Sequence, residues 1–303
     1  MPDNNKRILG LSIEDAVTGT NLFSFYMACL VAILLATFLP QTQVLILSEY
    51  LDVPFGELEI ISGNLNFWGE IVIILTIGLF GVASDRVGRR IVMSGGFLIM
   101  SVAFWLYPRA ESVNELLLFR LIYSAGIAAV SVMLVTVVAD YVKDVSRGKA
   151  TGYLGVMNGL GAMIAALVLI KLPARFVEGG ASPLDAGVMT FNIVIAISLG
   201  SAVLMWFGLK KGLPAQHEER PGFFTMLTDG VRAARDPGIA LAYGASFVAR
   251  GNLAVAGTFL SIWLVKYGTI ELGMEDAEAL AKAGTIIAIS YSAALFGAPI
   301  LAS

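Results

Sequence analysis

Charged side chains are scarce in this sequence. Lysine, arginine, aspartate and glutamate make up 14% of its 303 residues, whereas hydrophobic residues make up 57%. Soluble globular domains contain about 25% charged and about 45–50% apolar residues. The mean hydropathy of +0.80 agrees with this imbalance. The composition therefore excludes an ordinary soluble domain.

Cysteine and histidine are almost absent, with one residue of each. Cys29 cannot form a disulfide within the chain, and His217 lies in a polar stretch where a surface position is expected. The sequence shows no cluster of metal ligands, no nucleotide-binding glycine loop and no nucleophile–base pair. We therefore expect no metal, no cofactor, no nucleic-acid partner and no enzymatic activity. The missing Walker pattern also argues against ATP as an energy source.

Long apolar runs are abundant in the chain. A helix of about 20 apolar residues crosses ~30 Å of hydrocarbon. Backbone polar groups in lipid must be satisfied within their own segment, which predicts helices, whereas a β-barrel would show shorter alternating segments. The predicted fold class is therefore all-α, a polytopic membrane helix bundle. Eight spans are expected, at residues 22–49, 61–84, 91–108, 115–140, 152–171, 187–209, 237–265 and 283–303.

The positive charges are distributed unevenly along this layout. Of the 20 lysines and arginines, thirteen fall on the side of the N-terminus, five on the opposite side, and two, Arg120 and Arg250, within spans. The positive-inside rule therefore predicts a cytoplasmic N-terminus. The first apolar run is too long for a signal-peptide core, so we expect a retained helix. The expected location is the cell (inner) membrane, with membrane lipids around the bundle.

Polar stretches divide the chain into four parts. We expect a mixed polar cytoplasmic tail at 1–21, a six-helix bundle at 22–209, a cytoplasmic loop at 210–236 and two further helices at 237–303. Apolar residues at helical spacing within the loop predict a helix along the inner membrane surface. They are Phe223, Phe224, Leu227 and Val231.

Two short repeats relate the beginning and the end of the chain. Residues 37–39 recur at 258–260, and residues 79–81 recur at 295–297, with offsets of 221 and 216. Each repeat pairs a span with the sixth span after it. This spacing is typical of parallel six-helix halves joined by a long inner loop.

The charged stretch at residues 85–90 follows the second span, and Gly81 lies four residues before its first residue. Residues 81–90 resemble the signature loop between the second and third helices of Major Facilitator Superfamily transporters. The resemblance implies an inner gate, in which Asp85 pairs with a motif arginine and faces the eleventh helix of the other half. The alternative to the gate is that the three arginines serve only to orient the helices in the membrane. The motif residues are Gly81, Asp85, Arg86, Gly88, Arg89 and Arg90.

The resemblance implies twelve helices, of which this sequence holds eight. We therefore expect a truncated or incomplete second half. The alternative to a working transporter is a transport-incompetent fragment or a membrane sensor. If the resemblance holds, the gate motif of the first half acts on a helix that lies beyond Ser303.

Asp140, Asp144 and Arg147 close the fourth span at its predicted cytoplasmic end. The resemblance implies that they belong to the same inner charge network as Asp85. Read as plain sequence, they fit a solvated loop equally well. Both interpretations remain open at this stage.

Two ionisable residues within spans are candidates for proton coupling. Arg120 lies about five residues into the fourth span, where it resembles the fourth-helix arginine of the family; otherwise it snorkels to the outer surface. Glu70 lies near the middle of the second span, where an ionised carboxylate is costly and usually functional. Asn66 lies one turn away on nearly the same face. The alternative for Glu70 is a structural carboxylate that is neutral or hydrogen-bonded to Asn66.

Other polar residues within spans are candidates for the solute cavity. Arg250 lies midway along the seventh span, where it either binds an anionic group of the cargo or pairs with Glu70. Asn252, Asn66, Gln41, Gln43 and Asn158 are further candidates, although hydrogen bonding between helices also explains such residues.

The expected function is secondary active transport of a small solute by alternating access, with protons as the coupling ion. Symport is favoured by Glu70 and Arg120. The alternative is proton-driven efflux by antiport, but Leu160 stands where the family's antiporter motif has proline. The identity of the solute does not follow from these residues.

Overall fold

The computed structural model describes residues 6–54, 56–212, 222–254 and 260–274, together with four helical positions at 282, 286, 289 and 290. Two short strands come first, β1 (Arg7–Ile8) and β2 (Leu11–Ser12). The α-helices follow as α1 (Gly19–Leu45), α2 (Leu58–Val87), α3 (Arg89–Leu106), α4 (Val113–Tyr141), α5 (Arg147–Ile164), α6 (Leu172–Glu178), α7 (Pro183–Gly208), α8 (Phe223–Ala233), α9 (Pro237–Ala254) and α10 (Leu260–Lys266). Turns of π-helix extend α1, α5 and α10, at Ile46–Tyr50, Ala165–Leu169 and Tyr267–Glu271. Turns of 3₁₀-helix follow α3 at Tyr107–Arg109 and precede α5 at Asp144–Ser146.

The first six predicted spans are confirmed. Six helical stretches among the described residues are long and apolar enough to cross a membrane, namely Gly19–Tyr50, Leu58–Val87, Arg89–Arg109, Val113–Tyr141, Asp144–Glu178 and Pro183–Gly208. The seventh predicted span corresponds to α9 and α10, with residues 255–259 between them outside the described part. Most of the eighth also lies outside it. The all-α bundle predicted from the apolar runs is the observed fold.

Short polar side chains mark where three of the spans begin. Thr18, Ser112 and Ser182 each accept a hydrogen bond from the backbone N–H three residues later, at 3.2, 3.3 and 3.1 Å. Such caps satisfy one of the free N–H groups at a helix start. The spans α1, α4 and α7 therefore begin at these residues for a local reason, in addition to the hydropathy of the helices themselves.

Aromatic rings fill the contact between α1, α3 and α7. The ring of Phe38 lies 6.2 Å from that of Phe104 and 5.4 Å from that of Phe191, measured between ring centroids. All three side chains are fully buried. Because no hydrophobic driving force brings helices together in lipid, van der Waals packing of this kind stabilises their association.

The N-terminal segment departs from the prediction of a polar tail. The strands β1 and β2 form an antiparallel hairpin, and Leu11, Ile13 and Val17 have 0% exposure. Ile13 also forms a backbone bridge to Val142, just after α4. Residues 6–17 therefore pack against the end of α4 as part of the folded bundle. The buried apolar residues alternate with polar ones too briefly for the pattern to stand out in the sequence.

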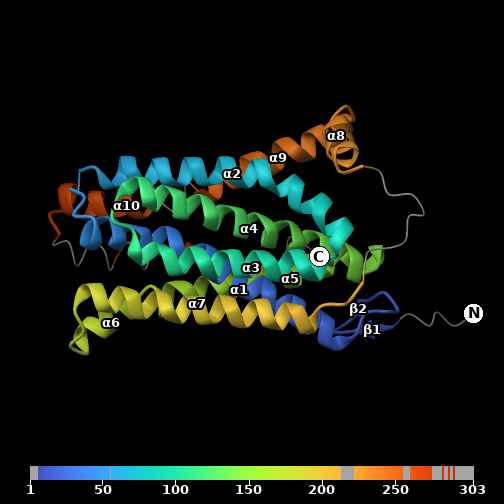
Figure 1. Ribbon diagram of the computed structural model, residues 1–303, viewed down its shortest axis with the longest axis horizontal. Coiled ribbons are helices and arrows are strands. Elements are labelled where there is room, and N and C mark those ends of the chain that lie inside the picture. Colours follow the sequence, from blue (N-terminus) through green and yellow to red (C-terminus); the bar gives the residue numbers. More distant parts are fainter. Residues whose placement is uncertain are drawn as a thin grey trace, which may run out of the picture.

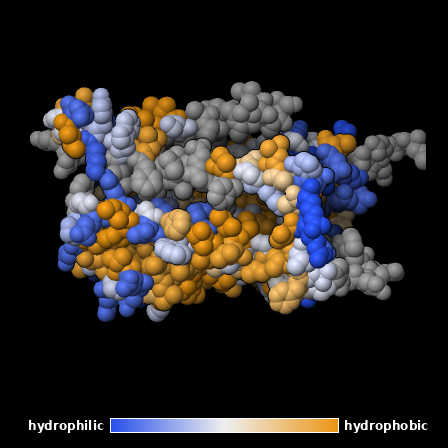
Figure 2. Space-filling view, turned by 90° about the horizontal axis from the view of Figure 1, so that it is seen from above, coloured by the Kyte–Doolittle hydropathy of each residue, from blue (hydrophilic) through white to orange (hydrophobic). Residues whose placement is uncertain are grey.

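The two ends of the bundle carry different elements. Figure 1 shows β1, β2 and α8 at one end of the long axis and α6 and α10 at the other. We call these the inner and the outer end, following the predicted orientation. At the outer end, the Lys266 ammonium lies 2.5 Å from the Glu59 carboxylate, which ties α10 to α2. In Figure 2 hydrophobic residues cover the middle and hydrophilic ones gather toward the ends, as expected for a membrane-embedded bundle.

The helix predicted within the central loop is present as α8. It lies at the inner end (Figure 1), with Phe224 and Val231 exposed by 78% and 72%. Leu227 is half-buried and faces Gly78 of α2. An amphipathic helix with exposed apolar residues at this level suits the membrane interface.

Candidate functional site

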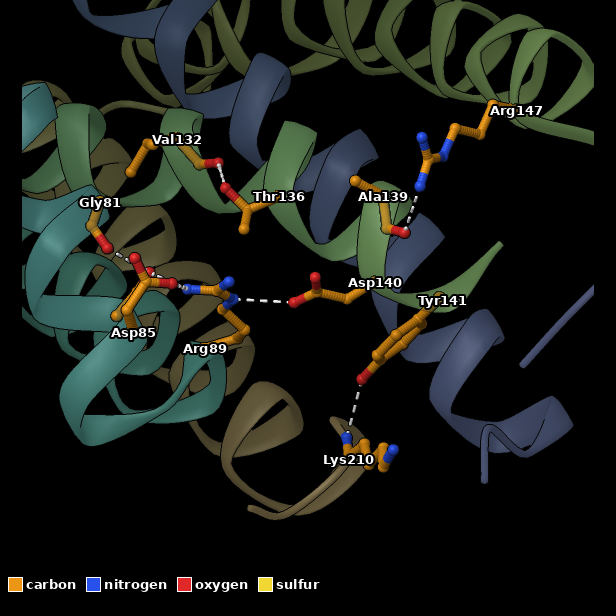
Figure 3. A network of polar contacts seen from close by, with 11 residues as sticks. Gly81, Asp85, Arg89, Val132, Thr136, Ala139, Asp140, Tyr141, Arg147 and Lys210 are labelled. Atoms are coloured by element: carbon orange, nitrogen blue, oxygen red, sulfur yellow. Dashed lines mark hydrogen bonds and ion pairs between the residues drawn. The ribbon is translucent and has the colours of Figure 1, made fainter. Parts of the chain in front are cut away.

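An ion-pair network joins three helix ends at the inner end of the bundle. Arg89, in the first turn of α3, forms an ion pair with Asp85 of α2, and its Nε lies 2.8 Å from Oδ2 of Asp140 in α4. Its Nη1 also donates to the Ser84 hydroxyl. Figure 3 shows the guanidinium between the two carboxylates. We call Ser84, Asp85, Arg89 and Asp140 the inner charge network.

Gly88 forms the turn that makes this network possible. It ends α2 and begins α3 with φ of 98° and ψ of 149°, a conformation that is essentially restricted to glycine. A Cβ at this position would lie 3.1 Å from the carbonyl oxygen of Gly212. The sharp turn places Asp85 and Arg89 on facing helix ends. At Gly81, by contrast, an added Cβ would meet only Val132 of α4, at an ordinary contact distance of 3.8 Å.

The other arginines of the motif lie apart from the network. Arg90 donates to the backbone carbonyl of Trp206 at 3.0 Å, and its guanidinium lies 4.5 Å from the centroid of that indole ring. Arg86 is exposed in the last turn of α2. Arg90 therefore ties α3 to α7 at the inner surface.

Asp140, Asp144 and Arg147 do not act as one group. Asp140 belongs to the inner charge network, whereas Asp144 and Arg147 pair with each other at 2.7 Å with side chains 82% and 50% exposed. Arg147 also donates to the carbonyl of Ala139, on the far side of α4 from Arg89 in Figure 3. The network interpretation thus holds for Asp140, and the solvated-loop interpretation for the other two.

A second polar cluster lies buried toward the outer end. Arg120 is 7% exposed, and its Nη2 donates to Oδ1 of Asn66 at 2.9 Å. The Tyr107 hydroxyl donates to Oε1 of Gln43 at 3.1 Å and also lies close enough to Arg120 for an electrostatic interaction. We call Gln43, Asn66, Tyr107 and Arg120 the Arg120 cluster. The alternative in which Arg120 snorkels to the outer surface is wrong, because its side chain points between α2 and α4.

Gly69 explains why Arg120 can lie flat against α2. A Cβ at Gly69 would come within 3.2 Å of Nε of Arg120 and 2.8 Å of the Ser124 hydroxyl. Sequence reasoning missed Gly69 and Tyr107, whereas Gln43 was among its candidates. Glycine one turn after Asn66 was the available signal, since small residues mark close approach between membrane helices.

The remaining candidates fall into two groups. Glu70 and Gln41 are half-buried, and Oδ1 of Asn158 is buried without a hydrogen-bond partner among the described residues. The side chains of Arg250 and Asn252 lie outside the described residues, so the predicted Arg250 contacts stay predictions. The structure therefore brings together Arg120 and Asn66, which the sequence assigned to different roles.

The arrangement offers no reactive nucleophile beside a base among the described residues around these two clusters. Its chemistry consists of ion pairs at the inner end and hydrogen-bond donors buried toward the outer end. Such groups can bind a solute, hold a conformation or exchange a proton.

Comparison with known proteins identifies the family of the chain. The profile of the Major Facilitator Superfamily matches residues 22–303. Magnetosome protein MamH of Paramagnetospirillum magneticum is 24% identical over 91% of this chain and 63% of its own length. Magnetosome protein MamZ of the same organism is 24% identical over 99% of the chain and 47% of its own length. The chain thus spans about half to two-thirds of the length of these relatives.

The fold also matches a solved transporter structure. A bacterial homologue of the human lysosomal transporter Spinster, in an inward-facing and unoccupied conformation, superposes with a TM-score of 0.60 at 18% identity. The match covers 90% of this chain and 60% of that one. The profile matches residues 22–303, and six helices among the described residues are long and apolar enough to cross a membrane, with the motif turn at Gly88 between the second and the third; the chain belongs to the Major Facilitator Superfamily of membrane transporters.

Proposed function

We propose that the protein is a secondary active transporter that moves a small solute by alternating access, coupled to protons in symport. The observation that carries this proposal is the inner charge network. Arg89 links α3 to α2 and α4 through ion pairs whose carboxylates are 38% and 34% exposed. Exposed pairs of this kind are worth about 0.2–1 kcal/mol each, so they can break and re-form during a transport cycle. A gate needs contacts of this strength.

In this proposal Glu70 carries the coupling proton. It lies one turn from Asn66, which binds Arg120, so a change in its charge would be felt by the Arg120 cluster. Arg120 remains charged at all relevant pH values and does not itself exchange a proton. The solute binds between the two halves, as in related folds, with contacts that extend from the midplane toward the outer end, where Asn66 lies. Gln41, Asn158, Arg250 and Asn252 are the proposed contacts beyond Asn66.

The coupling role can be tested with Glu70→Gln. Uptake by the whole protein in liposomes is measured with and without an inward proton gradient. We expect wild-type uptake to rise with the gradient and the variant to lose that dependence while it still binds solute. Glu57→Gln is the matched control, since Glu57 is an exposed carboxylate at the start of the same helix. If Glu70→Gln keeps the wild-type dependence on the gradient, the coupling role is wrong.

A further inference from the structure

Within the part of the chain that the structure describes, no carboxylate forms an ion pair with Arg120. The guanidinium is 7% exposed and always protonated. Its hydrogen bond to Oδ1 of Asn66, at 2.9 Å, is to a neutral amide. In the described ranges, none of the ion pairs, counted to an N···O distance of 4.0 Å, involves Arg120. Buried charges in proteins are normally paired, because an isolated one is costly to desolvate.

Hydrogen-bond donors are also in excess around this charge. Nε and Nη1 of Arg120 and Nε2 of Gln43 are buried without an acceptor in the part of the chain that the structure describes. Gln43 has 0% exposure, and its Oε1 is already occupied by the Tyr107 hydroxyl. Buried polar groups are bonded in the great majority of cases. Among the described residues, the cluster therefore has more buried donors than acceptors, even with the Tyr107 hydroxyl beside the guanidinium, and no carboxylate paired with Arg120.

Four elements position these groups at a similar depth. Gln43 lies near the outer end of α1, Asn66 in the outer part of α2, Tyr107 in the turn after α3, and Arg120 in the second turn of α4. The Tyr123 ring adds a wall, with its centroid 5.3 Å from the guanidinium carbon. Gly69 leaves the space in which Arg120 lies. Cluster residues from separate helices converge here, which is how ligand sites inside helix bundles are built.

We propose that the Arg120 cluster binds a compact carboxylate-type anion, and that the solute of the transporter carries this group. The planar guanidinium matches a carboxylate geometrically, and hydrogen bonds between two charged partners are about twice as strong as neutral ones. The anion supplies both the missing charge and the missing acceptors. This inference rests on the proposed function and names the class of its solute.

Acetate and acetamide are the two probes, because a comparison of their binding distinguishes recognition of negative charge from recognition of shape. Both are small and planar, but only acetate is charged. Saturation-transfer NMR of the methyl protons is recorded with the whole protein in detergent. We expect a saturable acetate signal from wild type and none from acetamide. Nitrate is added as a competitor, and displacement of acetate by nitrate would show that charge and planarity suffice for binding.

Two variants locate the binding. Arg120→Gln is expected to weaken acetate binding by about tenfold or more, since a charge-assisted hydrogen bond is lost. Asn66→Asp places a carboxylate beside Nη2, so the site is filled from within; acetate binding is lost while the melting temperature is kept. If Arg120→Gln does not fold, Asn66→Asp alone tests whether acetate binds at the Arg120 cluster. Arg109→Gln is the control, because Arg109 is an exposed arginine at the same end of α3.

Three outcomes overturn the inference. They are an absence of saturable acetate binding by wild type, equal signals from acetate and acetamide, and wild-type binding by both Asn66→Asp and Arg120→Gln. Because the readout is binding, it is independent of uptake. A protein that transports a neutral solute but binds no acetate would therefore refute this inference and leave the proposed transport function standing.

Discussion

Single residues decide how firmly the inner ends of the helices are joined. Arg89 is 14% exposed and holds Asp85, Asp140 and Ser84 at once. Its planar guanidinium offers several donors in fixed directions, which a lysine ammonium cannot reproduce. The proposed gate therefore depends on this one side chain more than on the exposed arginine of the motif, Arg86.

Replacement of Arg89 should impair transport more than replacement of a neighbouring arginine. Arg89→Gln removes two ion pairs, worth about 0.4–2 kcal/mol together, which corresponds to roughly 2- to 30-fold in a conformational equilibrium. We expect solute uptake in liposomes to fall by about that factor. Arg147→Gln breaks only an exposed local pair and should change uptake by less than about twofold. Equal effects of the two variants would remove Arg89 from the gate.

Gly88 should tolerate no side chain. Gly88→Ala forces alanine into a backbone region at φ of 98°, at a cost of about 1–3 kcal/mol, and adds a contact of 3.1 Å to the Gly212 carbonyl. We expect a lower melting temperature by differential scanning fluorimetry. Gly95→Ala is the control, since a Cβ there meets no atom within 4 Å and the helical position favours alanine. A Gly88→Ala protein as stable as wild type would contradict the account of this turn.

At the scale of elements, close helix crossings set the packing of the bundle. α5 crosses α1 at Gly161, where a Cβ would lie 2.2 Å from the carbonyl oxygen of Leu30. α3 crosses α4 at Gly96 and Gly126. A Cβ added at Gly96 would lie 3.0 Å from the carbonyl oxygen of Gly126, and one added at Gly126 would lie 2.9 Å from that of Gly96. Small residues permit such approach in membranes, where van der Waals contact drives association.

The crossing of α1 and α5 predicts a strong effect of one methyl group. Gly161→Ala must push the two backbones apart, because the nearest atom is a main-chain oxygen that cannot rotate away. We expect a destabilisation of about 1–3 kcal/mol, the usual cost of overpacking, seen as earlier thermal unfolding in detergent. Gly200→Ala in α7 meets no atom within 4 Å and should unfold with wild type. Coincident unfolding of both variants would disprove the crossing.

The spans could be predicted from the sequence, while their contacts could not. Apolar length alone determines a membrane helix, so the first six were found with small shifts at their ends. The packing of residues 6–17 against the bundle was missed because Val142, with which Ile13 pairs, is distant in sequence. The depth of Arg120 along its helix could be read from the sequence, but depth does not reveal direction, and the missing side chain of Gly69 leaves room beside the guanidinium. Gln43 was a candidate either for the cavity or for hydrogen bonding between helices, and its bond to the Tyr107 hydroxyl fits the second of these.

At the scale of the whole molecule, orientation follows from the distribution of charge. The inner end carries β1, β2, α8 and the ion-pair network, and the outer end carries α6 and the Lys266–Glu59 pair (Figure 1). The positive-inside rule predicts that the inner end faces the cytoplasm. The native thiol, Cys29, has 0% exposure and leaves a low background for labelling.

Cysteine labelling in intact cells should confirm this orientation. In a Cys29→Ser background, Glu178→Cys at the end of α6 is expected to react with a membrane-impermeant maleimide. Val145→Cys, at a position 84% exposed beyond α4, should react only after the membrane is permeabilised. The reverse pattern would invert the topology and with it the assignment of the inner gate.

Solute-driven proton movement tests the central claim most directly. The whole protein is placed in liposomes that enclose a pH-sensitive dye, and hydrophilic solutes of different classes are added outside one at a time. Proton-coupled symport predicts that the transported solute acidifies the lumen, that Glu70→Gln abolishes the acidification, and that protein-free liposomes show none; the Arg120 cluster predicts that this solute is a carboxylate. If folded wild-type protein moves no protons with any solute, or if the lumen turns alkaline as in antiport, the proposed function is contradicted.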